Sequence, residues 1–126
     1  MATPQAVAQE FVQFYYLEFD KGKDARIAWS NLVYTDVSKL TFESTEHVGK
    51  AAIAEKLGGL PFEQVKHQVS TIDVQLTHHN DIVILVTGQL LVDEEQRPMN
   101  FSQVFQLAKD GERWFAVNDI FKLVLG

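Results

Sequence analysis

Residues 71–92 read TIDVQLTHHNDIVILVTGQLLV, two apolar stretches separated by the polar segment HHND. In the first stretch Ile72, Val74 and Leu76 alternate with polar residues, which is the period of a strand that buries one face. The second stretch, Ile82–Val92, is almost continuously apolar and predicts a strand buried on both faces. Because the polar segment predicts a turn, this part of the chain is expected to form an antiparallel pair of strands.

The sequence after this pair continues the pattern of strands joined by turns. Asp93–Pro98 is acidic and predicts a hairpin loop, and Phe101–Leu107 is the next strand. Asp110-Gly111 is a strong turn signal, and Trp114–Val124 is the last strand. The second half of the chain is therefore expected to consist of four long strands.

The sequence before this point is mostly helical in pattern. Thr3 is suited to cap a first helix, and Pro4 suits its first turn. A second helix is predicted from Asp24 to about Val33, a short strand over Ser38–Glu43, and a third helix over Lys50–Leu57. Early helices followed by antiparallel hairpins predict an α+β fold in which a sheet wraps round the helices.

Composition limits the possible partners and compartments. The 126 residues predict one domain, residues 1–126, and the net charge of -6 disfavours nucleic acid and favours a partner with a basic patch. The absence of cysteine excludes disulfides and thiolate metal sites. The N-terminus does not resemble a signal peptide, and the longest apolar run, Ile82–Val86, is too short to span a bilayer. A soluble intracellular protein without membrane insertion is expected.

A few polar residues could carry chemistry, each with a structural alternative. His67 could be a general base, but a structural histidine bonded to a carboxylate such as Asp20 is the preferred interpretation. Asp119 could be catalytic, although a buried carboxylate paired with a backbone group or a cation is preferred. His78 and His79 are adjacent and would point to opposite faces of a strand, which makes a poor metal pair. No phosphate-binding loop or metal motif occurs, so no catalytic residue, metal or cofactor is predicted.

Carboxylates near apolar residues suggest a protein-binding surface instead. Asp93, Glu94 and Glu95 lie in the predicted hairpin loop, and Glu43 follows Phe42 at the end of an early strand. If these carboxylates lie close together, they would form an acidic rim around exposed apolar residues. Such a rim suits a basic partner that carries an aromatic anchor.

Several segments, taken in order, resemble the nuclear transport factor 2 family. No single segment is diagnostic, but their joint occurrence at matching spacing over nearly the whole chain is specific. They are Phe14–Tyr16 with Phe19-Asp20, Leu40–Glu43, Gly49–Ile53 with Glu55–Leu57, Leu60–Phe62, Lys66-His67, Gly88–Leu90, Asp93–Glu95, Phe101–Phe105 and Asn118–Phe121.

The resemblance implies both a fold and a function. The fold would be a cone-shaped, strongly bent antiparallel sheet wrapped round three helices, a cystatin-like roll with an apolar cavity at its open end. The function would be that of a homodimeric nuclear import carrier that binds Ran-GDP and contacts Phe-Gly repeat nucleoporins. It would be found in cytoplasm and nucleus and concentrated at the nuclear pore. In this family an aromatic residue of Ran enters the cavity, and acidic rim residues pair with basic residues of Ran.

The family's functional positions map onto particular residues of this chain. Asp20 and His67 match a pair of the family motif that we interpret as structural. The Ran-binding set is Phe42, Glu43, Leu60, Val65, Asp93, Glu95, Ile120 and Phe121, and the dimer-interface set is Leu85, Val104 and Ile120. Four departures from the family pattern occur. Phe42 replaces the usual tryptophan, and Glu95 stands where aspartate is common. The segment Lys21–Ser30 is longer than the usual helix connection, and Pro4 lies where some members carry a tryptophan that meets Phe-Gly repeats.

Two other classes of function compete with the carrier. An isomerase or dehydratase could use the same cone as a reaction chamber, but the sequence lacks a convergent catalytic set and has the acidic rim. The chain could also be a dimerisation domain from a larger protein, although its apparent completeness argues against that. A carrier without enzymatic activity is the preferred hypothesis.

Overall fold

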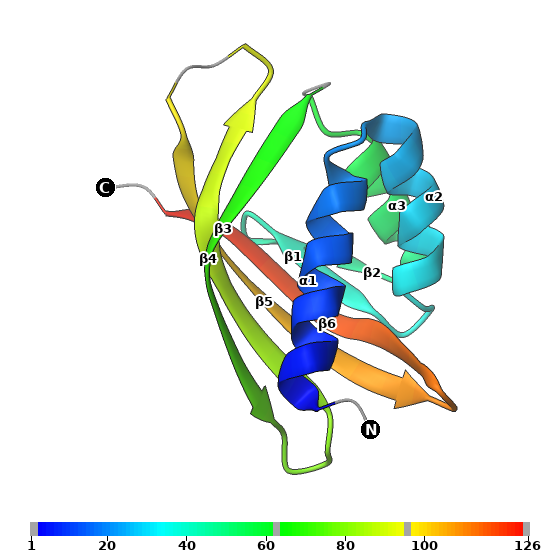
Figure 1. Cartoon of the computed structure of the whole chain (residues 1–126). Helices are drawn as coiled ribbons and strands as arrows, with labels where there is room; N and C mark the ends of the chain where they lie inside the picture. Colours follow the sequence, from blue (N-terminus) through cyan, green and yellow to red (C-terminus); the bar gives the residue numbers. More distant parts are fainter. Residues whose placement is uncertain (1–2, 62–63, 95–96, 125–126) are drawn as a thin grey trace.

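A computed structural model describes residues 3–61, 64–94 and 97–124 of the chain. Within these residues it contains three helices and one six-stranded sheet (Figure 1). The helices are α1 (Pro4–Phe19), α2 (Lys23–Val33) and α3 (Lys50–Gly58), and the strands are β1 (Lys39–Phe42), β2 (Thr45–Val48), β3 (Val65–Leu76), β4 (Ile82–Val92), β5 (Met99–Asp110) and β6 (Arg113–Val124). The predicted α+β fold, with helices enclosed by a bent sheet, is confirmed.

Helices α1 and α3 begin where the sequence predicts, whereas α2 begins at Lys23, just before the predicted Asp24. The Thr3 hydroxyl accepts the backbone N–H of Ala6 at 3.1 Å, and Pro4 is the first residue of α1. Helices α2 and α3 pack against each other at Gly58, where a Cβ atom would lie 2.7 Å from Cδ1 of Ile27. The absence of a side chain at Gly58 therefore sets how closely these helices approach.

The strand order is β2-β1-β6-β5-β4-β3, and one neighbouring pair differs from the prediction. Strands β3 to β6 pair antiparallel as expected, but β1 runs parallel to β6, with Phe42 opposite Phe121. The expectation of an antiparallel sheet is wrong at this point, because β1 is placed by a distant strand and not by a hairpin to it. Strand β2, which forms a hairpin with β1, was not predicted from the sequence.

The sheet bends at a bulge in β3. Val69 pairs with Gly88 and Thr71 with Thr87, so Ser70 is the extra residue. A Cβ atom on Gly88 would lie only 2.3 Å from the carbonyl oxygen of Gln68 and 3.0 Å from Cε1 of Phe101. Glycine therefore allows the backbones of β3 and β4 to approach at the bend, and a bulge increases strand twist and curvature.

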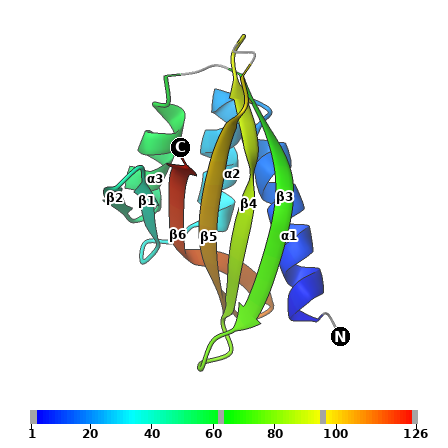
Figure 2. The same cartoon turned by 90° about the vertical axis from the view of Figure 1, so that its left-hand side faces the viewer.

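The concave face of the sheet holds α1 and the core, while its convex face is free of helices (Figure 2). Ile82, Ile84 and Val86 of β4 point into the core and are at most 1% exposed, whereas Leu85 on the other face is 41% exposed. The prediction that β4 is buried on both faces is therefore wrong for a single chain. The sequence of β4 is almost continuously apolar because apolar side chains lie on its convex face as well as on its core face.

Candidate functional site

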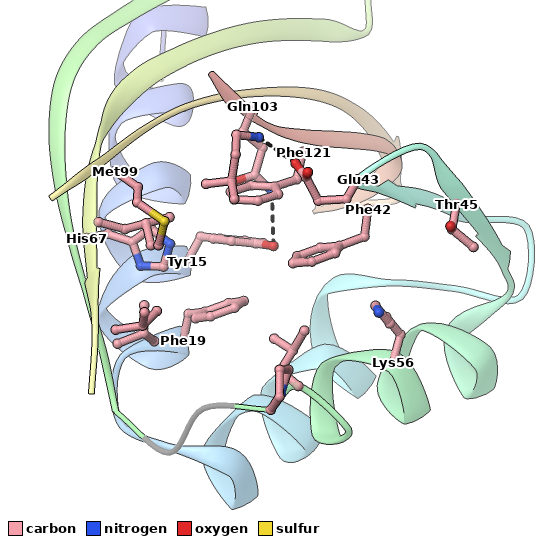
Figure 3. A pocket seen from close by; sticks show the side chains of 16 residues that line it. Tyr15, Phe19, Phe42, Glu43, Thr45, Lys56, His67, Met99, Gln103 and Phe121 are labelled. Atoms are coloured by element: carbon pink, nitrogen blue, oxygen red, sulfur yellow. Dashed lines mark hydrogen bonds between the residues drawn. The ribbon is translucent and has the colours of Figure 1, made fainter. Parts of the chain in front are cut away.

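A cavity of about 370 Å³ opens at one end of the cone (Figure 3). Its lining residues come from α1, α3 and all six strands, as well as the segment that follows α3. Most of the side chains are aromatic or aliphatic. Only a few polar groups interrupt this surface, so the cavity suits an apolar group that needs a small number of polar contacts.

Five of the predicted Ran-binding residues line this cavity, namely Phe42, Glu43, Leu60, Val65 and Phe121. The rings of Phe42 and Phe121 stack with their centroids 4.8 Å apart and an interplanar angle of 13°. They meet because β1 and β6 are in parallel register at these residues. The parallel strand pair thus builds the aromatic wall of the cavity.

Glu43 lies at the edge of the cavity in a turn that also fixes its side chain. Glu43 and Ser44 connect β1 to β2 and have φ values of 50° and 75°, which are unusual for residues with a side chain. The Glu43 carboxylate accepts the backbone N–H of Leu123 at 2.5 Å, and the Glu43 backbone N–H donates to the carbonyl of Phe121 at 3.1 Å. Lys122 also donates to Ser44 Oγ at 2.9 Å, so the turn is tied to β6.

Asp93 lies beside the cavity and not in its lining. It follows Val92, a lining residue, and is itself exposed. Its carboxylate accepts the backbone N–H of Gln64 at 3.0 Å, and its own N–H donates to the Gln64 carbonyl at 2.8 Å. These bonds fix Asp93 at the end of β4. Glu95, the third predicted rim carboxylate, lies outside the described residues.

Ile120 does not line the cavity, and its assignment to the cavity wall is wrong. Neighbouring residues of a strand point to opposite faces, so Ile120 points outward while Phe121 points inward. Ile120 is 51% exposed and lies opposite Val104, which in turn lies opposite Leu85. The three residues predicted at the dimer interface therefore form one row across the convex face.

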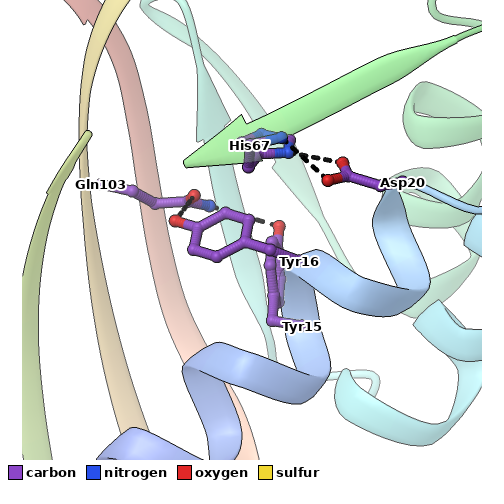
Figure 4. A network of polar contacts seen from close by, with 5 residues as sticks. All are labelled: Tyr15, Tyr16, Asp20, His67 and Gln103. Carbon is purple, nitrogen blue, oxygen red and sulfur yellow. Dashed lines mark hydrogen bonds and ion pairs between the residues drawn. The ribbon is translucent and has the colours of Figure 1, made fainter. Parts of the chain in front are cut away.

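His67 and Asp20 form the pair that the sequence suggested. Asp20 is the residue after α1, and its carboxylate contacts both Nδ1 of His67, at 2.6 Å, and the His67 backbone N–H, at 2.8 Å (Figure 4). The His67 ring stacks on Tyr16 with a centroid separation of 4.5 Å. The pair thus joins the end of α1 to the start of β3, and His67 also lines the cavity.

Asp119 is buried beneath the cavity, and its partners differ from those expected. Instead of a backbone group or a cation, it accepts hydrogen bonds from Tyr34 Oη at 2.6 Å, Gln103 Nε2 at 2.7 Å and Tyr15 Oη at 3.3 Å. Burial raises the pKa of Asp119 to about 6, and these three hydrogen bonds act in the opposite direction. Tyr16 extends the network by donating to Gln103 Oε1 at 2.6 Å (Figure 4 shows the Tyr15, Tyr16 and Gln103 part).

Several residues that line the cavity were not predicted from the sequence. Tyr15, Phe19 and Gln103 belong to segments that look like ordinary core, and only the fold shows that they face an open space. Lys56 was also missed; its ammonium group lies 5.1 Å from the centre of the Phe42 ring. Its position in the last turn of α3, beside the Leu60-Pro61 segment, was the available signal.

Neither a metal site nor a membrane span was found in the described parts of the chain. No three His, Asp or Glu side chains within residues 3–61, 64–94 and 97–124 are grouped so as to hold a metal ion. Across the same ranges, no helix has the length and apolar character needed to cross a bilayer.

The geometry of the cavity and sheet can be compared with known families. The model of the nuclear transport factor 2 (NTF2) domain matches residues 7–123. This chain belongs to the nuclear transport factor 2 family. A relative named nuclear transport factor 2, from Emericella nidulans, is 52% identical over 126 residues and covers 98% of each chain. The solved structure of nuclear transport factor 2 from Cryptosporidium parvum superposes with a TM-score of 0.87 at 33% identity, covering 95% of this chain and 94% of that one.

The fold is also found in proteins of other activity. A putative dehydratase from the NTF2-like family of Streptomyces avermitilis superposes with a TM-score of 0.80, covering 98% of this chain and all of that one, but at only 12% identity. At this low identity the likeness to the dehydratase shows a shared fold and nothing more. The family match and the 52% identity to a nuclear transport factor 2 show a relationship in sequence as well.

Proposed function

We propose that this chain, with residues 1–126 as a single domain, is a nuclear import carrier that binds Ran-GDP and has no enzymatic activity. The observation that carries the proposal is the aromatic-lined cavity with Glu43 fixed at its edge. Membership of the nuclear transport factor 2 family supports a role in nuclear transport. The carrier would move between cytoplasm and nucleus and be concentrated at the nuclear pore.

In the proposed complex, an aromatic side chain of Ran enters the cavity beside Phe42 and Phe121. The volume of about 370 Å³ leaves room for one aromatic ring. Glu43 would pair with a basic residue of Ran on one side of the ring, and Asp93 and Glu95 with another. Because the inserted ring displaces water from the mouth, these pairs would contribute more than open surface pairs do.

Glu43 is the residue that tests this proposal. Glu43→Lys places a positive charge beside a basic partner and should remove detectable binding of Ran-GDP. Truncating one partner of such a pair typically costs about 2–5 kcal/mol, roughly 30-fold or more in affinity. Calorimetry with Ran-GDP measures the effect, and equal affinities for wild type and Glu43→Lys would refute the site.

Two control variants separate charge from structure. Glu43→Gln keeps an oxygen that can accept the Leu123 N–H but removes the charge, so it should preserve the turn and still weaken binding about ten-fold. Glu46→Lys makes the same charge change on the neighbouring strand, at an exposed residue outside the cavity lining, and should bind almost as wild type does. If Glu43→Gln binds normally while Glu43→Lys does not, the effect belongs to the turn and not to a charge pair.

The proposal also concerns the nucleotide state of Ran. The family's contacts on Ran belong to a switch segment that moves when the γ-phosphate is present, so Ran with a GTP analogue should bind poorly. Added salt should weaken the Ran-GDP complex only in part, because the buried ring is not screened.

The carrier would further act as a homodimer that binds Phe-Gly repeats weakly. The row of Leu85, Val104 and Ile120 on the uncovered face supports a sheet-to-sheet dimer. Weak repeat binding suits rapid passage, because a slow off-rate would hold the carrier at each repeat. NMR titration with a repeat peptide tests this part; the absence of shifts at millimolar peptide would count against passage by this route.

A further inference from the structure

A second hollow of the molecule is an open groove between α1 and the turn that joins β5 to β6. Its volume is about 660 Å³, and within the part of the chain that the structure describes it shares no lining residue with the cavity of the cone. Figure 1 shows the start of α1 and this turn at the end of the molecule away from the β4–β5 loop. The groove is therefore separate from the proposed Ran site.

The apolar wall of the groove consists of Val7 and three aromatic rings, those of Phe11, Phe14 and Trp114. Phe11 packs edge-on against Phe105 of the core, with ring centroids 5.1 Å apart and an interplanar angle of 75°, so its position is fixed. Phe14 is 42% exposed, and Phe11 and Trp114 are half-buried. The three rings thus offer aromatic surface to an occupant of the groove.

Three charged side chains, Glu10, Lys109 and Glu112, line the same groove and are exposed. None of them forms an ion pair or a side-chain hydrogen bond with another residue of the described ranges. Two carboxylates against one ammonium group give the lining a net charge of -1. The charge of the lining therefore favours a cation over an anion.

Lys109 already places a cation over one of the aromatic rings. Its ammonium group lies 5.5 Å from the centre of the Trp114 ring, because the two residues are partners across the β5–β6 hairpin. This separation is in the range of a cation–π interaction. Lys109 is exposed and its stem is flexible, so its ammonium group can leave the ring when another cation binds there.

We propose that this groove binds a small organic cation with a quaternary ammonium group, whose methyl groups pack against Phe14 and Trp114. Such a group has no N–H that needs an acceptor, and aromatic faces attract its charge. A primary ammonium is a compact, strongly hydrated charge, so an apolar wall compensates it poorly for lost water. Glu10 and Glu112 attract the cation, and the volume is in the range of small-molecule sites.

A pair of isosteric probes tests the part played by the charge. Choline and 3,3-dimethylbutan-1-ol have the same shape, but the alcohol has a carbon atom in place of the charged nitrogen. In NMR titrations of the whole protein we expect a dissociation constant for choline on the order of a millimolar, roughly three- to ten-fold below that of the alcohol. The indole N–H signal of Trp114 should shift with choline. Equal affinities, tighter binding of the alcohol, or no binding of choline would overturn the proposal.

A lysine variant tests whether the bound cation takes the place of Lys109. Lys109→Gln removes the ammonium group from the Trp114 ring, so it should bind choline roughly three-fold more tightly and the alcohol almost as wild type does. Lys39→Gln makes the same charge change at an exposed residue outside the groove and should leave choline binding unchanged. Equal effects of the two variants would show that net charge alone is responsible and would refute the site.

Two further variants assign the selectivity to the ring and to a carboxylate. Trp114→Leu should abolish the preference for choline over the alcohol, and a preserved preference would contradict the proposal. Glu10→Gln changes an exposed residue of α1, so it provides an answer even if Trp114→Leu does not fold. It should weaken choline binding roughly two- to three-fold and leave alcohol binding unchanged, since only the cation is attracted by the carboxylate. Wild-type affinity for choline in Glu10→Gln would also contradict the proposal.

Discussion

At the residue scale, Asp119 shows what a buried carboxylate requires. Two tyrosines and a glutamine donate to it, and it is 1% exposed. Burial disfavours the charged form of Asp119 more than these three donors favour it. The pKa of Asp119 is therefore raised from its usual 3.8 to about 6. At neutral pH Asp119 is still mainly ionised, but in the folded protein it takes up a proton at a higher pH than an ordinary aspartate does.

This raised pKa predicts how stability depends on pH. Between pH 3.8 and about 6 the folded protein keeps the proton on Asp119 and the unfolded chain does not. This proton uptake adds to the free energy of unfolding. Its contribution is fully present below pH 3.8 and is lost as the pH rises through about 6. The free-energy difference between wild type and Asp119→Asn should therefore move by about 1 kcal/mol in favour of wild type on going from pH 7 to pH 5.

Chemical denaturation of both proteins at pH 7, 6 and 5 provides the measurement. Asp119→Asn should also be the less stable protein at pH 5, because its amide nitrogen cannot accept a hydrogen bond from Gln103. A difference between the two proteins that does not change with pH would show that Asp119 titrates near its usual value.

At the element scale, the bend of the sheet depends on Gly88. In Gly88→Ala the new methyl group would meet a backbone carbonyl of β3, which cannot rotate away as a side chain does. We expect a loss of roughly 3 kcal/mol in the free energy of unfolding, at the upper end of overpacking effects. Thermal or urea unfolding measures it.

Gly111 provides the comparison for that variant. It has a φ of 64° in the β5–β6 turn, and nothing lies within 4 Å of a Cβ added there. Gly111→Asn should change stability by less than about 0.5 kcal/mol, since asparagine tolerates this conformation and the site is open. Similar losses for both variants would mean that the close approach at Gly88 can relax.

Elements with a clear apolar period could be predicted from sequence, and those placed by distant partners could not. Helix α1, with Thr3 and Pro4 at its start, and the long strands β3 to β6 carry local signals. Strand β2, TEHV, is short and largely exposed, so it has no apolar period. The parallel pairing of β1 with β6 depends on a contact between remote segments, which no local pattern shows.

In the candidate site, too, some residues could be predicted from the sequence and others depend on contacts between remote segments. Phe42, Glu43 and Phe121 were found through the family resemblance, and the structure brings them together in one cavity. Ile120 was expected both at the cavity wall and at the dimer interface; because neighbouring residues of a strand point to opposite faces, it cannot share the cavity face of Phe121. The partners of Asp119 could not be predicted, because Tyr15, Tyr34 and Gln103 come from three separate segments.

At the scale of the whole molecule, the convex face of the sheet predicts self-association. Ile120→Glu would place a charge in the row formed with Leu85 and Val104, so it should produce monomers. Light scattering measures the mass in solution. Leu17→Glu makes the same change at a residue of α1 that is 60% exposed and should leave the dimer intact. A full dimer in Ile120→Glu would reject the assignment.

The parallel pairing of β1 with β6 has a consequence for how the protein folds. The two rings that form the aromatic wall come from segments far apart in the chain, Phe42 from its first half and Phe121 from near its C-terminus, so the wall exists only after a long loop has closed. The entropy cost of closing a loop grows only slowly with its length. Contacts between remote segments nevertheless slow folding, because the loop must close before they can form. During synthesis, at about 5–20 residues per second, β6 is the last strand to emerge. Until then Leu40 and Phe42 lack their partner strand, and the nascent chain exposes an unfinished apolar edge that is open to aggregation or to chaperones.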